Sequence, residues 1–230
     1  MNEQTLQELE TLLKREKKEL FDAYRALLLE YNERYNLTTI LAENDMFYKH
    51  FLDSVVGEKY FPKGCRIIEI GSGAGFPSMP LKLMRDDLSF TLVESVGKKC
   101  EFLHAAVDKL GLKGMNIYSK RAEDLAREEI HREKYDVATA RAVARMNTLS
   151  EYCLPFVKVG GVFVAYKSGD TTEIDEAKTA YKVLGAKLKN VEKYELPEGY
   201  GERALAVVEK IASTPKKYPR GQGKERKSPL

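Results

Sequence analysis

The sequence is poor in the residues that build disulfides and metal sites. It contains three cysteines and three histidines among 230 residues. Cys65, Cys100 and Cys153 are odd in number, far apart and outside C-x-x-C spacing, which predicts reduced, mostly buried thiols in a cytoplasmic protein. With so few histidines, we expect no metal site. His50 lies three residues before Asp53 on one face of a predicted helix, and we interpret the two as a structural pair.

Long apolar runs and internal repeats are also missing. No stretch approaches the roughly 20 apolar residues that a membrane-spanning helix needs. The first residues are rich in Glu and Gln and do not resemble a signal peptide. We therefore expect no membrane partner. A chain of 230 residues can form one large domain, or one domain with an extension, and we expect a monomer.

The most informative feature that is present is an apolar strand followed by glycines. Residues 66–70 are mostly isoleucine, which is typical of a buried parallel strand. Gly71, Gly73 and Gly75 follow at alternate positions, where a backbone without Cβ can turn sharply and approach a ligand. Pro77 suits the first turn of a helix. A strand, a glycine turn and a helix N-terminus indicate a nucleotide-type cofactor site.

An acidic residue stands at the end of the next predicted strand. Glu94 ends the apolar segment 89–94, about 20 residues beyond the glycines. At this spacing a carboxylate accepts hydrogen bonds from ribose hydroxyls. The alternative is a tight turn followed by a solvated glutamate. Together with the glycines, Glu94 favours a cofactor that contains ribose.

The glycine spacing bears on which cofactor binds. Dinucleotide sites follow G-x-G-x-x-G, with the pyrophosphate on a helix N-terminus. Residues 71–75 instead read G-x-G-x-G and are followed by the bulky Phe76. Pro77 and Pro80 remove N–H donors that a pyrophosphate would use. The loop therefore favours S-adenosylmethionine, which has a ribose but no phosphate, and NAD is the competing cofactor.

The order of the predicted elements indicates an α/β fold. Helices are expected over 3–35 and 44–59, the first with an apolar stripe at helical spacing. Strands and helices then alternate, which implies a parallel sheet covered on both faces. The predicted strands are 65–70, 89–94, 115–119, 135–140, 161–167, 186–195 and 203–210. The predicted helices between them are 77–84, 97–110, 122–130, 146–156 and 172–184.

The last two predicted strands have only a short connection, residues 197–201, so they are expected to pair antiparallel. Mostly parallel strands that end in such a hairpin form the seven-stranded, Rossmann-like sheet of class I methyltransferases. A dinucleotide dehydrogenase more often has six parallel strands. The sequence therefore predicts the methyltransferase sheet with an N-terminal helical extension.

Charge separates a C-terminal tail from the rest of the chain. We expect an N-terminal helical extension over residues 1–60, a cofactor-binding domain over 61–213 and a tail over 214–230. The tail has six basic residues and one acid. Its prolines and glycines oppose regular structure, so we expect it to be extended and to lie outside the glycine-loop site. Such a tail commonly lies along the backbone of a polyanion. The alternative is that it only aids solubility.

Further polar residues follow predicted strands at the carboxyl edge of the sheet, where ligands bind. Residues 121–124 follow the third strand, where an adenine ring would lie. Arg141 and Arg145 follow the fourth strand, and Lys167 ends the fifth. The alternatives are acids that complement a helix dipole and arginines that are only solvated.

Taken together, the motifs resemble those of the bacterial 16S ribosomal RNA guanine-N7 methyltransferases, the RsmG or GidB family. The resemblance runs through nearly the whole chain. The matching motifs are Tyr35-Asn-Leu-Thr38, His50-Phe-Leu-Asp-Ser54, Glu69-Ile-Gly-Ser-Gly-Ala-Gly-Phe-Pro77, Arg121-Ala-Glu123, Thr139-Ala-Arg-Ala-Val-Ala144 and Thr214-Pro-Lys-Lys-Tyr-Pro-Arg220. The family usually has Asp where Glu69 and Glu94 stand here, and either acid can accept ribose hydroxyls.

The resemblance implies a cofactor, a reaction and a substrate. Family members transfer the methyl group of S-adenosylmethionine to N7 of guanine 527 in 16S ribosomal RNA. Carried over by motif position, the cofactor contacts are Gly71, Phe76, Ala122, Glu123 and Arg141, with Glu94 at the ribose, and the loop itself adds Gly73 and Gly75. Because guanine N7 has a lone pair and no proton, no general base is expected, and proximity and alignment would supply the catalysis.

The resemblance also implies contacts to RNA, either naked 16S RNA or the 30S subunit. Arginine and lysine side chains hold phosphates and so fix the register of the RNA. The candidates are Arg141, Arg145, Lys167, Arg203, Lys216, Lys217 and Arg220. Two other functions stay open, an NAD-dependent oxidoreductase and a non-catalytic ribosome assembly factor.

Overall fold

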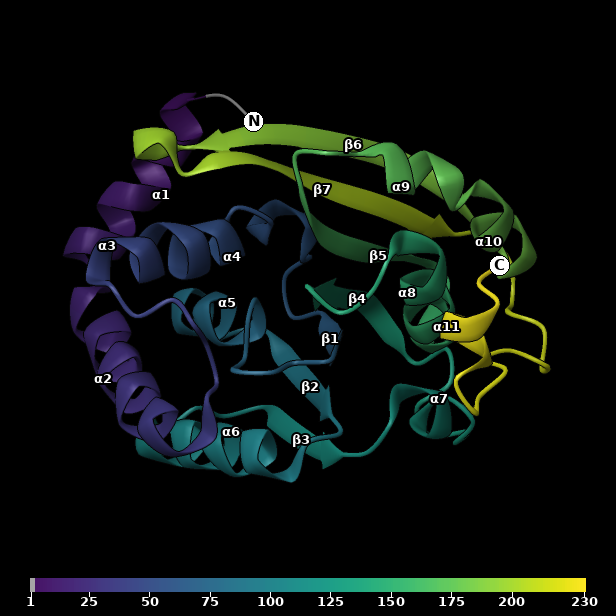
Figure 1. The fold of residues 1–230 in the computed structure, drawn as a ribbon, viewed down its shortest axis with the longest axis horizontal. Helices are drawn as coiled ribbons and strands as arrows, with labels where there is room; N and C mark the ends of the chain where they lie inside the picture. Colours follow the sequence, from purple (N-terminus) through teal and green to yellow (C-terminus); the bar gives the residue numbers. More distant parts are fainter. Residues whose placement is uncertain (1–2) are drawn as a thin grey trace.

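A seven-stranded sheet forms the centre of the molecule, with helices on both faces (Figure 1). The computed structural model describes residues 3–230. The strand order is β3-β2-β1-β4-β5-β7-β6; β7 is antiparallel to both of its neighbours, and the other adjacent pairs are parallel. The strands are β1 (Arg66–Ile70), β2 (Ser89–Glu94), β3 (Met115–Ser119), β4 (Tyr135–Arg141), β5 (Val157–Ser168), β6 (Ala186–Leu196) and β7 (Gly201–Lys210). The predicted sheet with its antiparallel hairpin is confirmed.

Successive residues of β1 enter two different cores. Ile67 packs on one face with residues such as Phe102, and Ile68 packs on the other face with residues such as Leu149. This alternation follows from the two-residue period of a strand. Because helices cover both faces, both sets of positions are apolar, which explains the nearly continuous apolar run in the sequence.

The helices divide between the two faces. The face that holds Ile67 is covered by α1 to α6, and the opposite face by α7 to α10, with α11 packed against α8. The helices are α1 (Glu3–Arg15), α2 (Lys18–Tyr35), α3 (Glu43–Met46), α4 (Asp53–Val55), α5 (Ser78–Met84), α6 (Gly97–Lys109), α7 (Ala122–Leu125), α8 (Met146–Cys153), α9 (Thr172–Glu176), α10 (Lys178–Val183) and α11 (Lys224–Lys227). A π-helical turn, η1 (Phe47–Leu52), and three 3₁₀ turns, η2 (Glu58–Tyr60), η3 (Leu154–Phe156) and η4 (Pro197–Gly199), complete the regular structure. Across residues 3–230, no helix is both long and apolar enough to cross a membrane.

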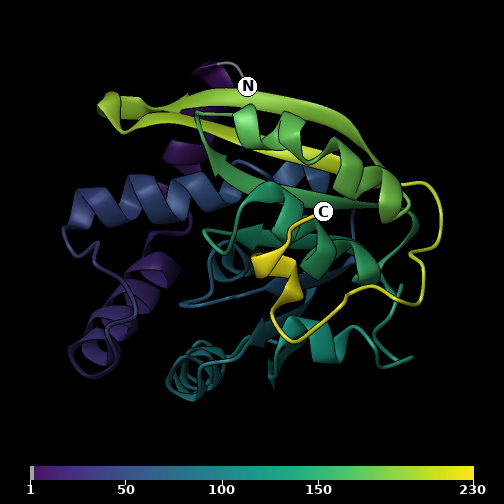
Figure 2. The ribbon, with the colours of Figure 1, turned by 45° about the vertical axis from the view of Figure 1, so that its right-hand side comes forward.

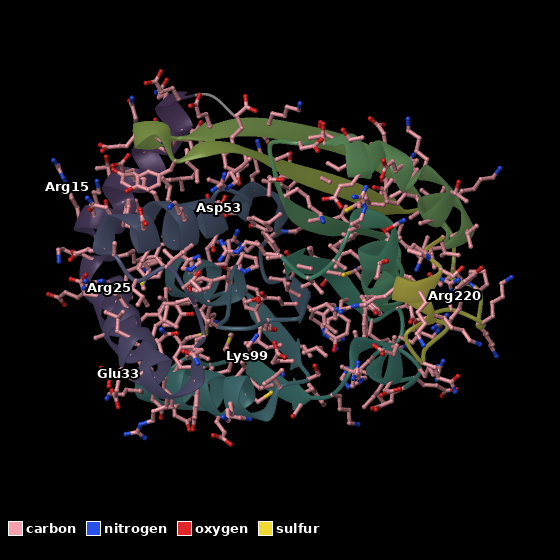
Figure 3. The ribbon with its side chains drawn as sticks, viewed as in Figure 1. Arg15, Arg25, Glu33, Asp53, Lys99 and Arg220 are labelled. Atoms are coloured by element: carbon pink, nitrogen blue, oxygen red, sulfur yellow. The ribbon has the colours of Figure 1, made fainter. Side chains whose placement is uncertain are left out.

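Several predicted helices are shorter than the sequence suggested. The single helix over 3–35 is wrong, because the chain breaks between α1 and α2. Residues 14–18 are all charged and give the core no apolar side chain; Arg15, for example, is exposed on the outer side of the molecule (Figure 3). The predicted stripe residue Leu20 is exposed, and Phe21 is buried instead. The helix predicted over 44–59 is likewise divided into α3, η1, α4 and η2.

The N-terminal helices share the core of the sheet. Tyr24 of α2 is fully buried, and its ring lies 5.7 Å from that of Phe76 and 6.3 Å from that of Phe102. Its hydroxyl donates a hydrogen bond to the carbonyl of Ala74. Helix α2 therefore supports the glycine loop from its buried side, although the helix ends more than thirty residues before the loop in the chain.

The C-terminal tail folds back onto the domain and does not extend away from it (Figure 2). Tyr218 and Pro219 are buried, and residues 224–227 form α11 beside α8. Arg132 donates hydrogen bonds to the carbonyls of Thr214 and Tyr218, at 2.8 and 2.9 Å. The expected extended tail is therefore wrong. Main-chain carbonyls of the tail accept hydrogen bonds from an arginine of the domain, and these bonds hold the tail against it.

Candidate functional site

The glycine loop turns the chain sharply between β1 and α5. The N–H groups of Gly71 and Ser72 both donate to the carbonyl of Val93, at 2.8 and 3.2 Å. The three loop glycines have positive φ angles, but a side chain would meet different surroundings at each. A Cβ on Gly71 would lie 2.7 Å from Val143, and one on Gly75 would lie 2.4 Å from Met79, whereas one on Gly73 would meet only the carbonyl oxygen of Gly71, at an ordinary contact distance of 3.9 Å. Packing therefore requires the outer two glycines, and only Gly73 leaves room for a ligand.

Glu94 joins the glycine loop to the next strand. One carboxylate oxygen accepts a hydrogen bond from the N–H of Gly73 and the other from the N–H of Val96, both at 2.9 Å. Each oxygen still has a lone pair for a further donor. The predicted carboxylate at the end of β2 thus stands beside the loop, with capacity left for two hydroxyl groups.

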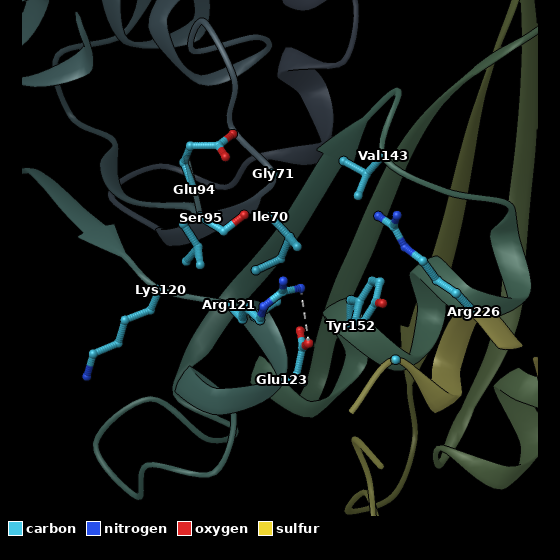
Figure 4. Close-up of a pocket in the computed structure, with 13 residues that line it drawn as sticks. Ile70, Gly71, Glu94, Ser95, Lys120, Arg121, Glu123, Val143, Tyr152 and Arg226 are labelled. Atoms are coloured by element: carbon cyan, nitrogen blue, oxygen red, sulfur yellow. Dashed lines mark ion pairs between the residues drawn. The ribbon is translucent and has the colours of Figure 1, made fainter. Parts of the chain in front are cut away.

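A first cavity of about 260 Å³ opens above these residues (Figure 4). It brings together four of the predicted cofactor residues, Gly71, Glu94, Ala122 and Glu123. The other predicted cofactor residues, Gly73, Gly75, Phe76 and Arg141, are not among those that line it. Apolar side chains of Ile70, Val93 and Val143 form further walls.

Three further lining residues of this first cavity come from parts of the chain that the sequence analysis did not connect with it. Tyr152 comes from α8, and Gly223 and Arg226 come from the C-terminal tail. The expectation that the tail lies outside the glycine-loop site is therefore wrong. No local pattern indicates this contact, because it depends on the tail folding back over α8.

Glu69 is buried beneath the loop. One of its oxygens accepts a hydrogen bond from the N–H of Ser78 at 3.1 Å, and Oε1 has no hydrogen-bond partner among the described residues. Burial raises the pKa of Glu69 to about 8, against the effect of its hydrogen bonds and of Arg141. The carboxyl group is thus largely protonated at neutral pH and keeps one polar atom unsatisfied.

A second cavity of about 640 Å³ lies beside the first and shares Val143 with it. Its walls are rich in cations, which come from η1, β4, β5, β7 and the β4–α8 loop. It brings together four predicted residues, Arg141, Arg145, Lys167 and Arg203. Lys49, His50 and Asp53 also line it.

Arg141 is held in place by a network around Asp53. Its guanidinium donates to Asp53 Oδ2 and lies within hydrogen-bond distance of His50 Nδ1, both at 3.0 Å, and it stands 4.9 Å from the ring centre of Phe76. The hydroxyl of Tyr194 donates to Asp53 Oδ1 at 2.8 Å. His50 and Asp53 are thus structural partners of Arg141, a contact that the sequence analysis did not predict. Their spacing and their place in one motif were the only signals of it in the sequence.

The electrostatics of the second cavity keep His50 neutral. Burial, followed by the charge of Arg141, lowers the pKa of His50 to about 3. Both ring nitrogens have partners, since Nε2 lies 2.9 Å from the hydroxyl of Thr38. The imidazole therefore positions Arg141 and is a poor base near neutral pH.

The predicted RNA-binding cations differ in how firmly they are already paired. Lys167 donates to the carbonyl of Ala144 at 2.8 Å and lies 3.2 Å from Glu173, whereas Arg145 forms an exposed ion pair with Glu176. Lys216 and Lys217 are exposed and line neither cavity.

Arg220 has a role that the sequence analysis did not predict. Its guanidinium donates to both carboxylate oxygens of the fully buried Glu151, at 2.9 and 2.6 Å. Losing this cation would leave the buried carboxylate unpaired. Arg220 therefore anchors the tail, and its contact with RNA stays a prediction.

Comparison with known proteins agrees with this geometry. A model of the family described as rRNA small subunit methyltransferase G matches residues 17–223. The chain belongs to the rRNA small subunit methyltransferase G family. The protein named Ribosomal RNA small subunit methyltransferase G from Brevibacillus brevis is 48% identical over 216 residues, which cover 93% of this chain and 91% of that relative.

Solved structures share the fold of this methyltransferase G family member at low identity. TYW2 from P. horikoshii, in complex with MeSAdo, has a TM-score of 0.54 at 15% identity, over 69% of this chain and 61% of that chain. Precorrin-6y C5,15-methyltransferase from Geobacter metallireducens has a TM-score of 0.50 at 12% identity, over 69% of this chain and 87% of that chain. The class I methyltransferase sheet predicted from the sequence is confirmed.

S-adenosylmethionine is the cofactor of this methyltransferase, and the first cavity has the chemistry to hold it. Glu94, which lines the cavity, offers two carboxylate oxygens to ribose hydroxyls, and the neighbouring Gly73 has no side chain to crowd them. Ala122 gives the cavity an apolar wall near the buried carboxylate of Glu123, which suits a flat ring with polar edges. The residues present therefore fit the group.

Proposed function

We propose that this protein methylates N7 of guanine 527 in 16S ribosomal RNA, in the cytoplasm and as a monomer. The observation that carries the proposal is a pair of adjoining cavities of different character. The first presents carboxylates suited to ribose and adenine, and the second presents cations suited to RNA, with Val143 in the wall of both. A methyl donor in the first cavity can thus lie next to a base in the second.

In this proposal, the cofactor contacts are those carried over by motif. Gly71, Gly73 and Gly75 shape the loop, Glu94 holds the ribose, and Ala122 and Glu123 hold the adenine. Phe76 supports the loop from its buried side, where it packs against Tyr24 and stacks with His50 at 4.4 Å between ring centres. Arg141, which lies over Phe76, faces the second cavity and connects the two sites.

The reaction needs positioning more than proton transfer. When bound, S-adenosylmethionine supplies an electrophilic methyl group on a sulfonium. Guanine N7 brings a lone pair and loses no proton, so the residues of the chain need only bind, orient and exclude water. The neutral His50 and the network around Asp53 fix Arg141 at the boundary of the cavities, which limits the poses of the incoming base.

The RNA backbone would contact the cations around the second cavity. Arg145 and Arg203 are 67% and 24% exposed at their side chains, so phosphate oxygens can reach them. Lys167 is 8% exposed and already bonded, and it supports the wall that the base would meet. Lys216 and Lys217 extend the basic surface along the tail. These residues fix register and do not read sequence.

The glycine loop has few donors left for a dinucleotide. The N–H groups of Gly71 and Ser72 are bonded to Val93, and those of Gly73 and Gly75 to Glu94 and Ser72. A pyrophosphate needs free backbone donors at this point. The site therefore supports S-adenosylmethionine over NAD, in agreement with the family.

A methyl-transfer assay tests the proposal. Purified protein and labelled S-adenosylmethionine would be incubated with 16S RNA, naked or in 30S subunits, from cells that lack this gene, and the labelled base would be mapped. We expect one N7-methylguanine at position 527 on at least one of the two substrates. Cofactor binding without transfer to either substrate would instead support a non-catalytic assembly factor.

A further inference from the structure

The C-terminal tail is fastened to α8 by a buried ion pair. The N–H and the guanidinium of Arg220 both donate to Glu151, whose side chain is fully buried. From the loop after α7, Arg127 donates to the carbonyl of Arg220 at 2.9 Å. A buried carboxylate that loses its only cation is strongly destabilising. The chain at this residue is therefore fixed on the domain.

A second attachment follows five residues later. Glu225 is fully buried, and its carbonyl accepts a hydrogen bond from the hydroxyl of Thr148 on α8 at 2.8 Å. Its carboxylate accepts a hydrogen bond from the N–H of Gly221, which closes the intervening residues into a compact loop. The segment of residues 221–227, which we name the C-terminal strap, is thus held at both of its ends.

The strap presents Arg226 to the first cavity. Because its neighbour Glu225 points into the domain, Arg226 points outward, and it lines the cavity together with Gly223 (Figure 4). On the cavity wall it lies beside Tyr152. Burial raises the pKa of Tyr152, and the nearby Arg226 acts in the opposite direction. Arg226 shares this cavity with Ala122 and Glu123, the residues proposed to hold adenine.

We propose that the C-terminal strap forms the outer wall of the cofactor site and that Arg226 contacts the adenosine part of S-adenosylmethionine. This inference rests on the proposed placement of the cofactor in the first cavity. A planar guanidinium stacks on the face of an aromatic ring and also donates to its ring nitrogens, which an ammonium does less well. Arg226 is then part of the cofactor site, although its sequence context is that of a basic RNA-binding tail.

Matched variants separate this role from a general effect of charge. Arg226→Ala removes the proposed contact, while Lys224→Ala and Lys227→Ala remove the same charge from exposed positions of the same helix that do not line the cavity. Because Arg226 is itself exposed, its removal leaves both anchors intact, namely the ion pair of Arg220 with the buried Glu151 and the buried Glu225. Thermal unfolding of all three variants would confirm that they fold.

Titration calorimetry with two ligands gives the test. S-adenosylmethionine and methylthioadenosine, which lacks the amino-acid part, would each be titrated into the wild type and the variants. We expect Arg226→Ala to weaken both ligands by about tenfold, as for loss of a partly desolvated cation–π contact. The two lysine variants should change affinity less than twofold.

Three results would overturn the inference. The first is unchanged affinity of Arg226→Ala for S-adenosylmethionine. The second is a loss for S-adenosylmethionine but not for methylthioadenosine, which would place Arg226 at the amino-acid end. The third is a loss confined to RNA binding. If the wild type itself failed to bind S-adenosylmethionine, the proposed function would fall first, so the two failures are distinguishable.

Discussion

Gly73 differs from its neighbouring glycines in what a side chain would meet. A Cβ at Gly73 would make a single contact, at 3.9 Å, which leaves room for a ligand at the loop, whereas Gly71 and Gly75 are explained by contacts with Val143 and Met79. Glu94, bonded to the N–H of Gly73, stands at the same point. At the scale of single residues, we therefore propose that cofactor binding depends on Gly73 and Glu94.

We expect Gly73→Val to abolish binding of S-adenosylmethionine, because the branched side chain would crowd the space beside Glu94, where the ribose is proposed to lie. Gly111→Val is the matched control, since Gly111 also has a positive φ and open space around its Cβ but lies far along the chain in the turn after α6. Both variants carry similar backbone strain, so both should lose similar stability while only Gly73→Val loses binding. Unchanged affinity in a folded Gly73→Val protein, measured by calorimetry, would remove the loop from the site.

The low pKa of His50 gives a prediction for the reaction rate. A general base would be tuned to a pKa near the working pH, whereas the pKa of His50 is lowered to about 3 by burial and by Arg141. The imidazole is therefore neutral throughout the range from about pH 6 to 8.5. We expect the single-turnover rate at saturating substrates to show no steep pH dependence there. A tenfold rise per pH unit, with binding unchanged, would reveal a base that the proposed mechanism lacks.

The C-terminal tail is the element whose structure differs most clearly from what its composition predicts. Prolines, glycines and six basic residues predicted an extended, freely accessible segment. In the structure, Arg220 forms an ion pair with the buried Glu151, and Arg226 lines the first cavity. The sequence could not show this, because the partner Glu151 lies 69 residues earlier on α8 and carries no local signal. Fewer of the tail charges are then left for RNA.

We expect Lys216 and Lys217 to be the tail residues that contact phosphates, since both are exposed. Replacing both by Ala should flatten the log–log dependence of RNA affinity on salt by about 1.4 units, from roughly 0.7 for each single-stranded phosphate contact. The affinity for S-adenosylmethionine should stay the same. The measurement is fluorescence anisotropy with 16S RNA fragments or 30S subunits at several salt concentrations.

The control for this experiment is a double variant of Lys63 and Lys113 to Ala. Both are exposed and precede β1 and β3, at the edge of the sheet opposite the site. It changes the net charge equally, so general electrostatic steering is matched. Equal salt slopes for the two double variants would contradict the prediction and would show that the tail lysines only aid solubility.

At the scale of the whole molecule, the parallel sheet does most of the positioning. It carries the ends of β1, β2, β4 and β5 to one edge, and for this reason Glu94, Arg141 and Lys167 could be placed near the site from the order of strands alone. The other side chains of the site could not be placed from the strand order. Asp53 lies 88 residues before Arg141, and Tyr24 lies 50 residues before the loop carbonyl that it contacts. Such pairs depend on how helices pack and have no local pattern.

The whole molecule thus presents two adjoining cavities with Val143 in the wall of both, which we propose bind the methyl donor and the RNA. The most direct test is mass spectrometry of 16S ribosomal RNA from cells with the gene, without it, and with it restored as wild type or Gly73→Val. We predict that, without the gene, the fragment containing guanine 527 is lighter by one methyl group, and that only the wild type restores it. An unchanged fragment in cells without the gene, or a methyl group lost from another position, would contradict the account.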